Sequence, residues 1–122
     1  MIQSYKDLDV YKRSLKLAMD ICWMPRKFPK EEIYALTSQI IRSSRSVSSN
    51  IVKGWAKRQY ENIFMQNPIH PLGSISETEN WLLFAKEYNY TDQKVLDQFV
   101  DELDQEGKVI NKLHQNWKSY GK

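Results

Sequence analysis

The sequence predicts an all-α protein, an up-down antiparallel four-helix bundle with short connections. Apolar residues recur every three or four positions along four long segments, and this is the period of one helix face. No segment shows the strict alternation that a strand would require. Only four glycines and four prolines occur, and they mark places where helices would end or break. At 122 residues the chain fits a single domain (1–122) with one buried core.

The first helix is predicted over residues 7–24, with Asp7 as its N-cap. One apolar face comprises Leu8, Tyr11, Leu15, Ala18 and Cys22. A second stripe beside it comprises Val10, Leu17 and Ile21. Two adjacent stripes indicate that the helix contacts more than one neighbour, as helices in a bundle do.

The second helix is predicted over residues 30–53. Pro29 suits an early helical position, and Glu31 and Glu32 suit the positive end of the helix dipole. Its apolar face comprises Ile33, Leu36, Ile40, Val47 and Ile51. Gly54 is the expected C-cap.

The third helix is predicted over residues 57–89, kinked or broken near Pro68–Pro71, with the break extending over about 67–73. Both prolines lack the N–H that a helix interior needs, at a cost of about 3 kcal/mol each. Helix should resume at Ser74, because Ser74 and Glu77 have the spacing of a capping box.

The fourth helix is predicted over residues 91–118, with Thr91 as its cap. Its apolar seam alternates steps of three and four through Leu96, Phe99, Leu103, Glu106, Ile110, Leu113 and Trp117. Glu106 is the one polar member of this seam, and Gly107 follows it.

Charge is divided unevenly along the chain. Residues 1–60 contain 12 Lys and Arg against 5 Asp and Glu, whereas residues 61–122 contain 6 against 10. One interpretation is an anionic partner for the first half. Another is attraction between the two halves or between neighbouring subunits, and a third is simply solvated helix faces.

No pattern in the sequence predicts catalysis, a metal or a cofactor. The two histidines, His70 and His114, belong to no recognisable nucleophile motif, and the spacing of histidines and cysteines gives no zinc signature. The single cysteine, Cys22, lies on an apolar stripe and indicates a reducing compartment. No apolar run approaches about 18 residues and no signal peptide is evident, so we expect a non-enzymatic cytoplasmic protein outside the membrane.

Basic residues give the clearest functional signal. On the second helix Arg42, Arg45 and Lys53 fall within a sector of roughly 80°, together with two serines. The remaining basic residues of the predicted surface are Lys12, Arg13 and Lys16 on the first helix and Lys57 and Arg58 after the second. Lys and Arg neutralise phosphates, so these residues predict a nucleic-acid interface. The alternative is a protein-interaction scaffold that binds no nucleic acid.

Serine fills five of the seven positions from Ser43 to Ser49. Serine is a mediocre helix former, but its small side chain lets helices approach closely and its hydroxyl bonds to backbone carbonyls. The run therefore predicts a close helix contact, within the bundle or between subunits, rather than a catalytic serine.

Several motifs resemble one known family. They lie in Lys6–Tyr11, Phe28–Glu32, Leu36–Ser43, Ser49–Gly54 and Gly73–Leu82. The chain resembles the four-helix-bundle proteins of intervening sequences in 23S ribosomal RNA genes, and is similar to the accessory variability determinant protein of diversity-generating retroelements. In this resemblance Ser49, Asn50, Ile51 and Gly54 form the structural hallmark.

The resemblance implies a homopentamer around a central channel and a non-enzymatic, nucleic-acid-associated role. In the retroelement branch it implies a reverse transcriptase and its template RNA as partners. The chain departs from the family pattern at Lys53, where an acidic residue is usual, and at Ala56, where a second glycine is usual. It also departs at Asn67–Pro71, where the family's helix runs unbroken.

Overall fold

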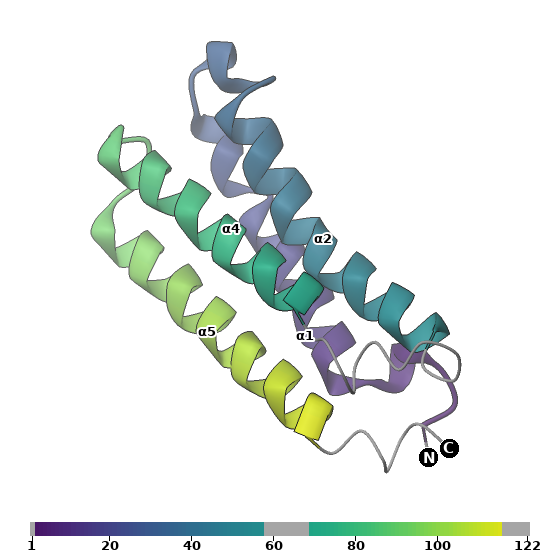
Figure 1. The fold of residues 1–122 in the computed structure, drawn as a ribbon. Coiled ribbons are helices and arrows are strands. Elements are labelled where there is room, and N and C mark those ends of the chain that lie inside the picture. Colours follow the sequence, from purple (N-terminus) through teal and green to yellow (C-terminus); the bar gives the residue numbers. More distant parts are fainter. Residues whose placement is uncertain (1, 58–68, 116–122) are drawn as a thin grey trace.

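The computed structural model describes residues 2–57 and 69–115, and these ranges are helical without any strand (Figure 1). Four long helices dominate: α1 (Asp9–Ile21), α2 (Leu36–Ala56), α4 (Ile69–Glu87) and α5 (Gln93–Gln115). Short 3₁₀ turns occupy Tyr5–Asp7, Met24–Lys27 and Lys30–Glu32. The all-α prediction with four bundled helices is therefore confirmed.

The helices pack in a ring, with α1 against α2, α2 against α4, α4 against α5, and α5 back against α1. The α1–α2 and α4–α5 connections meet at one end of the bundle, because the Tyr90 hydroxyl donates to Glu32 Oε2 at 2.8 Å. The rings of Phe28 and Tyr90 also pack there, with centroids 5.1 Å apart. The chain therefore approaches this end along α1 and α4 and leaves it along α2 and α5, as Figure 1 shows.

The core follows one stripe from each helix. Its fully buried aliphatic side chains are Ile21, Ile40, Ile51, Leu82, Leu103 and Ile110. Burying one such side chain contributes about 1.5–3 kcal/mol, so this set is a large part of the driving force for folding. On α1 the second predicted stripe is buried throughout. The first stripe is mixed: Leu8 and Ala18 are buried, Leu15 is 43% exposed and Cys22 is half-buried.

The start of the first helix differs from the prediction. Asp7 is not an N-cap: it closes a capping box in which its carboxylate accepts from Ser4 N while the Ser4 side chain accepts from Lys6 N. The α-helix begins after Leu8, which makes no side-chain cap, and ends at Ile21 rather than residue 24. A 3₁₀ turn containing Pro25 follows, since proline cannot continue the α-helical hydrogen bonding.

The second helix starts and ends later than predicted. Residues 30–32 form a 3₁₀ turn, and the backbone of Ala35 (φ −125°, ψ −108°) is not helical, so α2 begins at Leu36. Gly54 is not the C-cap, because it is buried inside α2, which continues to Ala56 and is capped by Lys57.

The third helix shows no break within the described residues. α4 is helical from Ile69, so the part of the predicted break that falls on residues 69–73 is not found. The rest of the predicted break lies in residues 58–68, which are outside the described residues, as does any kink there. Pro71 is the third residue of α4 as described, and its side chain is completely buried there. Ser74 is not a cap, because its hydroxyl donates to His70 O one turn earlier inside the helix.

The fourth helix confirms the predicted seam as far as Leu113; Trp117 lies outside the described residues. Its cap is Asp92 rather than Thr91, because the Asp92 carboxylate accepts from Val95 N at 2.8 Å. The turn before it depends on Asn89, whose φ of 64° lets the N–H groups of Asn89 and Tyr90 satisfy carbonyls at the end of α4.

Candidate nucleic-acid interface

The basic stripe predicted on α2 lies on the surface of the bundle. Arg42, Arg45 and Lys53 are all exposed, and the apolar positions one sector away are buried. Lys57 caps α2 and is also exposed, whereas Arg58 lies outside the described residues. α2 is one uninterrupted helix of 21 residues, so it holds the three stripe residues in fixed relative positions.

The stripe continues toward the end of α1 through two residues that the sequence interpretation missed. Arg45 lines a hollow of about 330 Å³ together with Arg26 and Lys30. The Arg26 guanidinium lies over the Trp23 ring at 3.8 Å, a cation–π contact that orients it. Arg26 and Lys30 lie in the 3₁₀ turns, where helical periodicity carries no information, so only the tertiary structure brings them to Arg45.

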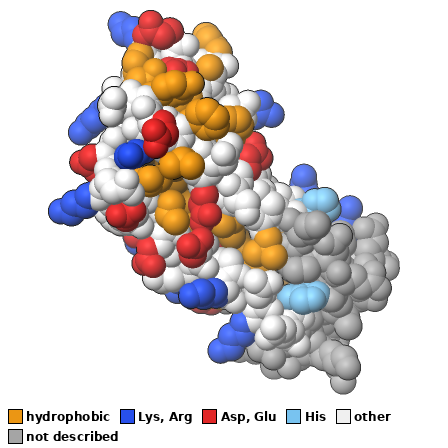
Figure 2. All heavy atoms as spheres, turned by 60° about the vertical axis from the view of Figure 1, so that its left-hand side comes forward, with side chains coloured by type: hydrophobic (Ala, Val, Ile, Leu, Met, Phe, Trp, Pro, Cys, Tyr) orange, Lys and Arg blue, Asp and Glu red, His pale blue; other side chains and the backbone are white. Residues whose placement is uncertain are grey.

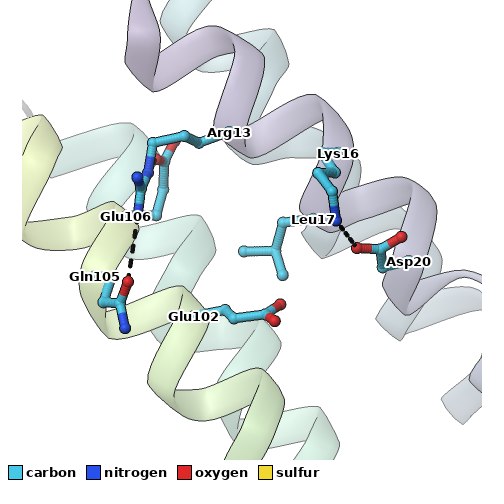
Figure 3. Close-up of a pocket in the computed structure, with 7 residues that line it drawn as sticks. All are labelled: Arg13, Lys16, Leu17, Asp20, Glu102, Gln105 and Glu106. Carbon is cyan, nitrogen blue, oxygen red and sulfur yellow. Dashed lines mark hydrogen bonds and ion pairs between the residues drawn. The ribbon is translucent and has the colours of Figure 1, made fainter.

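Two of the predicted α1 residues lie elsewhere, in a groove between α1 and α5 (Figure 3). Arg13 donates to Gln105 Oε1 at 3.4 Å, and its Nε lies 3.7 Å from Glu106 Oε1. Lys16 pairs with Asp20 at 2.8 Å. The structure therefore does not join Arg13 and Lys16 to the α2 stripe. The Asp20 carboxylate opposes the charge of Lys16, whereas Arg13 contacts the neutral amide of Gln105 and the buried carboxyl group of Glu106. Lys12 is exposed on the outer side of α1.

Glu106 is buried at the inner wall of the same groove, with 1% of its surface exposed. Neither carboxyl oxygen has a hydrogen-bond partner in the described structure. Burial raises the pKa of Glu106 to about 8, because the attraction of Arg13 offsets only part of the desolvation penalty and Asp9 adds repulsion. At neutral pH this carboxyl group is therefore mostly protonated, and its contact with Arg13 is not a full ion pair.

The serine run forms a polar seam between α2 and α4 within one chain. Ser46 and Asn50 donate to Ser74 Oγ at 2.6 and 3.2 Å. Thr78 Oγ1 lies 2.9 Å from the Ser43 hydroxyl and donates to a carbonyl of its own helix. The predicted close contact is thus found inside the bundle.

The hallmark residues are mainly structural. Ile51 is completely buried, Gly54 is buried within α2, and Asn50 bonds across to α4. Ser49 is exposed and its hydroxyl donates to Arg45 O at 3.3 Å. Lys53, the departure from the family pattern, lies beside them on the exposed stripe.

The described residues hold no group of three or more metal-ligating side chains that could bind an ion. The single cysteine donates its thiol to Met19 O at 3.0 Å. A second carboxyl group has a raised pKa: burial and the neighbouring Asp104 raise the pKa of Glu79 to about 7. No helix in the described ranges is long and apolar enough to cross a bilayer.

The fold and the surface define a four-helix bundle that exposes a basic stripe on α2. The sequence matches the family described as 23S rRNA-intervening sequence protein over residues 6–112. The chain therefore belongs to this family, as the motifs indicated. No curated protein matches the sequence.

Proposed function

We propose that this protein is a non-enzymatic, homo-oligomeric accessory protein that associates with nucleic acid, RNA or an RNA/DNA hybrid, in the cytoplasm. The observation that carries the proposal is the exposed stripe of Arg42, Arg45 and Lys53 on α2. The name of the family, which refers to a ribosomal RNA gene, is consistent with this role.

The proposed interface differs from the sequence-based one in its extent. Arg26 and Lys30 lie beside Arg45 and extend the stripe along the α1–α2 side of the bundle. Arg13 and Lys16 contribute less, because carboxyl groups and an amide in the α1–α5 groove already bind them. Phosphate contacts of this kind act through charge, so they recognise the backbone rather than the base sequence.

A second candidate function is a protein-interaction scaffold without nucleic-acid binding. The separation of charge between the two halves of the chain favours it, because a basic surface fits an acidic protein surface as well as a phosphate backbone. The homopentamer and, in the retroelement branch, the reverse transcriptase remain expectations from the family resemblance, and they fit either candidate.

Removal of the stripe tests the proposal directly. The probe is a labelled RNA of mixed sequence, titrated by fluorescence anisotropy at several salt concentrations. Wild type should bind more weakly as salt rises, because binding releases counterions. The triple variant Arg42→Ala/Arg45→Ala/Lys53→Ala should lose at least about tenfold in affinity and reduce the salt slope by roughly three.

The matched control is Lys94→Ala/Lys108→Ala/Lys112→Ala, which removes the same charge from exposed positions on α5. It should retain most of the affinity. Equal losses in both variants would show that binding follows net charge and not the α2 stripe. An oligomer with no salt-dependent RNA binding would favour the scaffold.

A further inference from the structure

The α1–α2 connection presents two large aromatic side chains to solvent. It comprises residues 22–35 and lies at the opposite end of the bundle from the start of α1 (Figure 1). Trp23 is 60% exposed and Tyr34 is 96% exposed. Side chains that stay this exposed add little to the hydrophobic stabilisation of the core, so the fold does not explain why large rings occupy these two positions.

The same connection exposes basic side chains. Arg26, Lys27 and Lys30 all lie on its surface, against two acidic residues in the sequence of the connection. One of the two, Glu32, is half-buried and accepts from the Tyr90 hydroxyl at 2.8 Å, so its carboxylate is turned toward the bundle. The exposed charge around the two rings is therefore mainly positive, which suits an anionic ligand.

The geometry links the rings to the basic stripe of α2. The Arg26 guanidinium lies 3.8 Å from the centre of the Trp23 ring, and Arg26 lines the same hollow as Arg45. Ile33, the residue before Tyr34, also lines that hollow. A polyanion that follows the stripe as far as Arg45 therefore arrives at the part of the connection that holds both rings.

We propose that the α1–α2 connection binds unpaired bases, so that the preferred nucleic acid is single-stranded RNA. This rests on the proposed nucleic-acid function and names the form of nucleic acid that its interface accepts. Bases of a single strand stack on aromatic rings and on Arg guanidinium planes, whereas the bases of a duplex are already stacked on one another. The α2 stripe would hold phosphates while Trp23, with Arg26 over it, and Tyr34 hold bases.

The exposed aromatic residues of α4 lack this setting. Phe84 is 42% exposed and Tyr88 is 55% exposed, and their ring centroids lie 6.1 Å apart. α4 contains three glutamates against one lysine. Figure 2 turns the α4 and α5 side forward and shows hydrophobic side chains gathered there among acidic ones. Because carboxylates repel phosphates, these two rings provide a matched control for the pair in the connection.

Substitution of the rings tests the proposal. The probe is a labelled RNA strand of about 16 nucleotides, titrated by fluorescence anisotropy both alone and annealed to its complement. Wild type should bind the single strand more tightly than the duplex. Trp23→Leu/Tyr34→Leu keeps apolar side chains but cannot stack, so it should lose at least about tenfold in affinity for the single strand and should lose the preference. Its salt slope should not change, because no phosphate contact is removed.

Two further variants separate stacking from other causes. Trp23→Phe/Tyr34→Phe keeps flat rings and should retain most of the affinity for the single strand. The control Phe84→Leu/Tyr88→Leu should bind both probes as wild type does. Circular dichroism checks that each variant is folded, and Tyr34→Leu alone, at a position that is almost fully exposed, repeats the test if the change at Trp23 disturbs the fold.

The outcomes distinguish this proposal from the proposed function. If Trp23→Leu/Tyr34→Leu binds the single strand as wild type does, or loses equally for single strand and duplex, the base-stacking proposal is overturned. A loss of binding in Arg42→Ala/Arg45→Ala/Lys53→Ala would still support the nucleic-acid function in that case. A wild type that binds neither probe would overturn both.

Discussion

The α2–α4 seam and the α1–α5 seam bury polar groups in different ways. Between α2 and α4, the buried hydroxyls of Ser43, Ser74 and Thr78 all have hydrogen-bond partners, at distances up to 3.4 Å. Between α1 and α5, the buried carboxyl of Glu106 has none, and the nearest cationic atom, Arg13 Nε, is 3.7 Å away. Both seams are polar, but only one of them satisfies its polar groups.

The difference shows why short neutral side chains suit a helix–helix contact and a carboxyl group does not. A serine or threonine hydroxyl reaches a carbonyl of its own helix as well as a neighbour across the seam. A buried carboxyl group needs several donors before its charged form is tolerated, and without them it keeps its proton. The first seam should therefore respond to packing changes and the second to pH.

The largest expected effect is the pH dependence of the second seam. The pKa of Glu106 is raised from 4.5 to about 8, so the folded state holds a proton that the unfolded state releases. The contribution of Glu106 to the free energy of unfolding is therefore fully present below about pH 4.5. It decreases as pH rises and is lost once pH has passed about 8. The free energy of unfolding, from urea titrations, should fall by a few kcal/mol over this range. Glu79 acts in the same direction up to about pH 7, with a smaller effect because it is only partly buried.

The variant Glu106→Gln isolates this contribution. Glutamine resembles the protonated acid in shape and cannot ionise, so the variant should be more stable than wild type at pH 8.5 and less dependent on pH. The exposed residue Glu87 provides the matched control, Glu87→Gln, which should follow the wild-type profile. If the free energy of unfolding of Glu106→Gln instead depends on pH as that of wild type does, the Glu106 carboxyl group of the wild type is already ionised at neutral pH.

A smaller effect should follow from overpacking the first seam. Ser43 is buried against Thr78, so Ser43→Leu forces α2 and α4 apart and removes a hydroxyl contact. We expect a loss of about 2–3 kcal/mol in the free energy of unfolding. The exposed neighbour gives the control, Ser49→Leu, which should cost well under 1 kcal/mol. Similar costs for the two variants would mean that the seam is loosely packed.

The smallest expected effect is the loss of one hydroxyl. Thr78→Val keeps the volume of a completely buried side chain but removes the bonds to Ser74 O and the Ser43 hydroxyl. Because Ser43 retains the carbonyl of Ile40 as a partner, the cost should be about 1 kcal/mol by urea unfolding, and it should not vary between pH 5 and 8. A pH-dependent cost would link the two seams.

Helix periodicity predicted the cores of the elements better than their ends. The seam of α5 from Leu96 to Leu113 is buried as expected, because a repeat of three and four places these side chains on one face. The predicted caps of the first and fourth helices were wrong because a neighbouring residue could fill the same role. Ser4 is the N-cap of a capping box that Asp7 completes, and Asp92 rather than Thr91 accepts from Val95 N. A break at Pro71 was predicted because proline is costly in a helix interior, but α4 is helical on both sides of this residue.

For the candidate interface, the sequence alone determined that Arg42, Arg45 and Lys53 share an exposed face of one helix, because 3.6 residues per turn fixes positions within a helix. Only the tertiary structure decided that Arg13 points to Glu106 while Arg26 lines the same hollow as Arg45. It also decided that α1 and α2 lie side by side, with α4 and α5 forming the other side of the bundle. Contacts between residues far apart in sequence depend on the order in which the helices pack, and no local period contains that order.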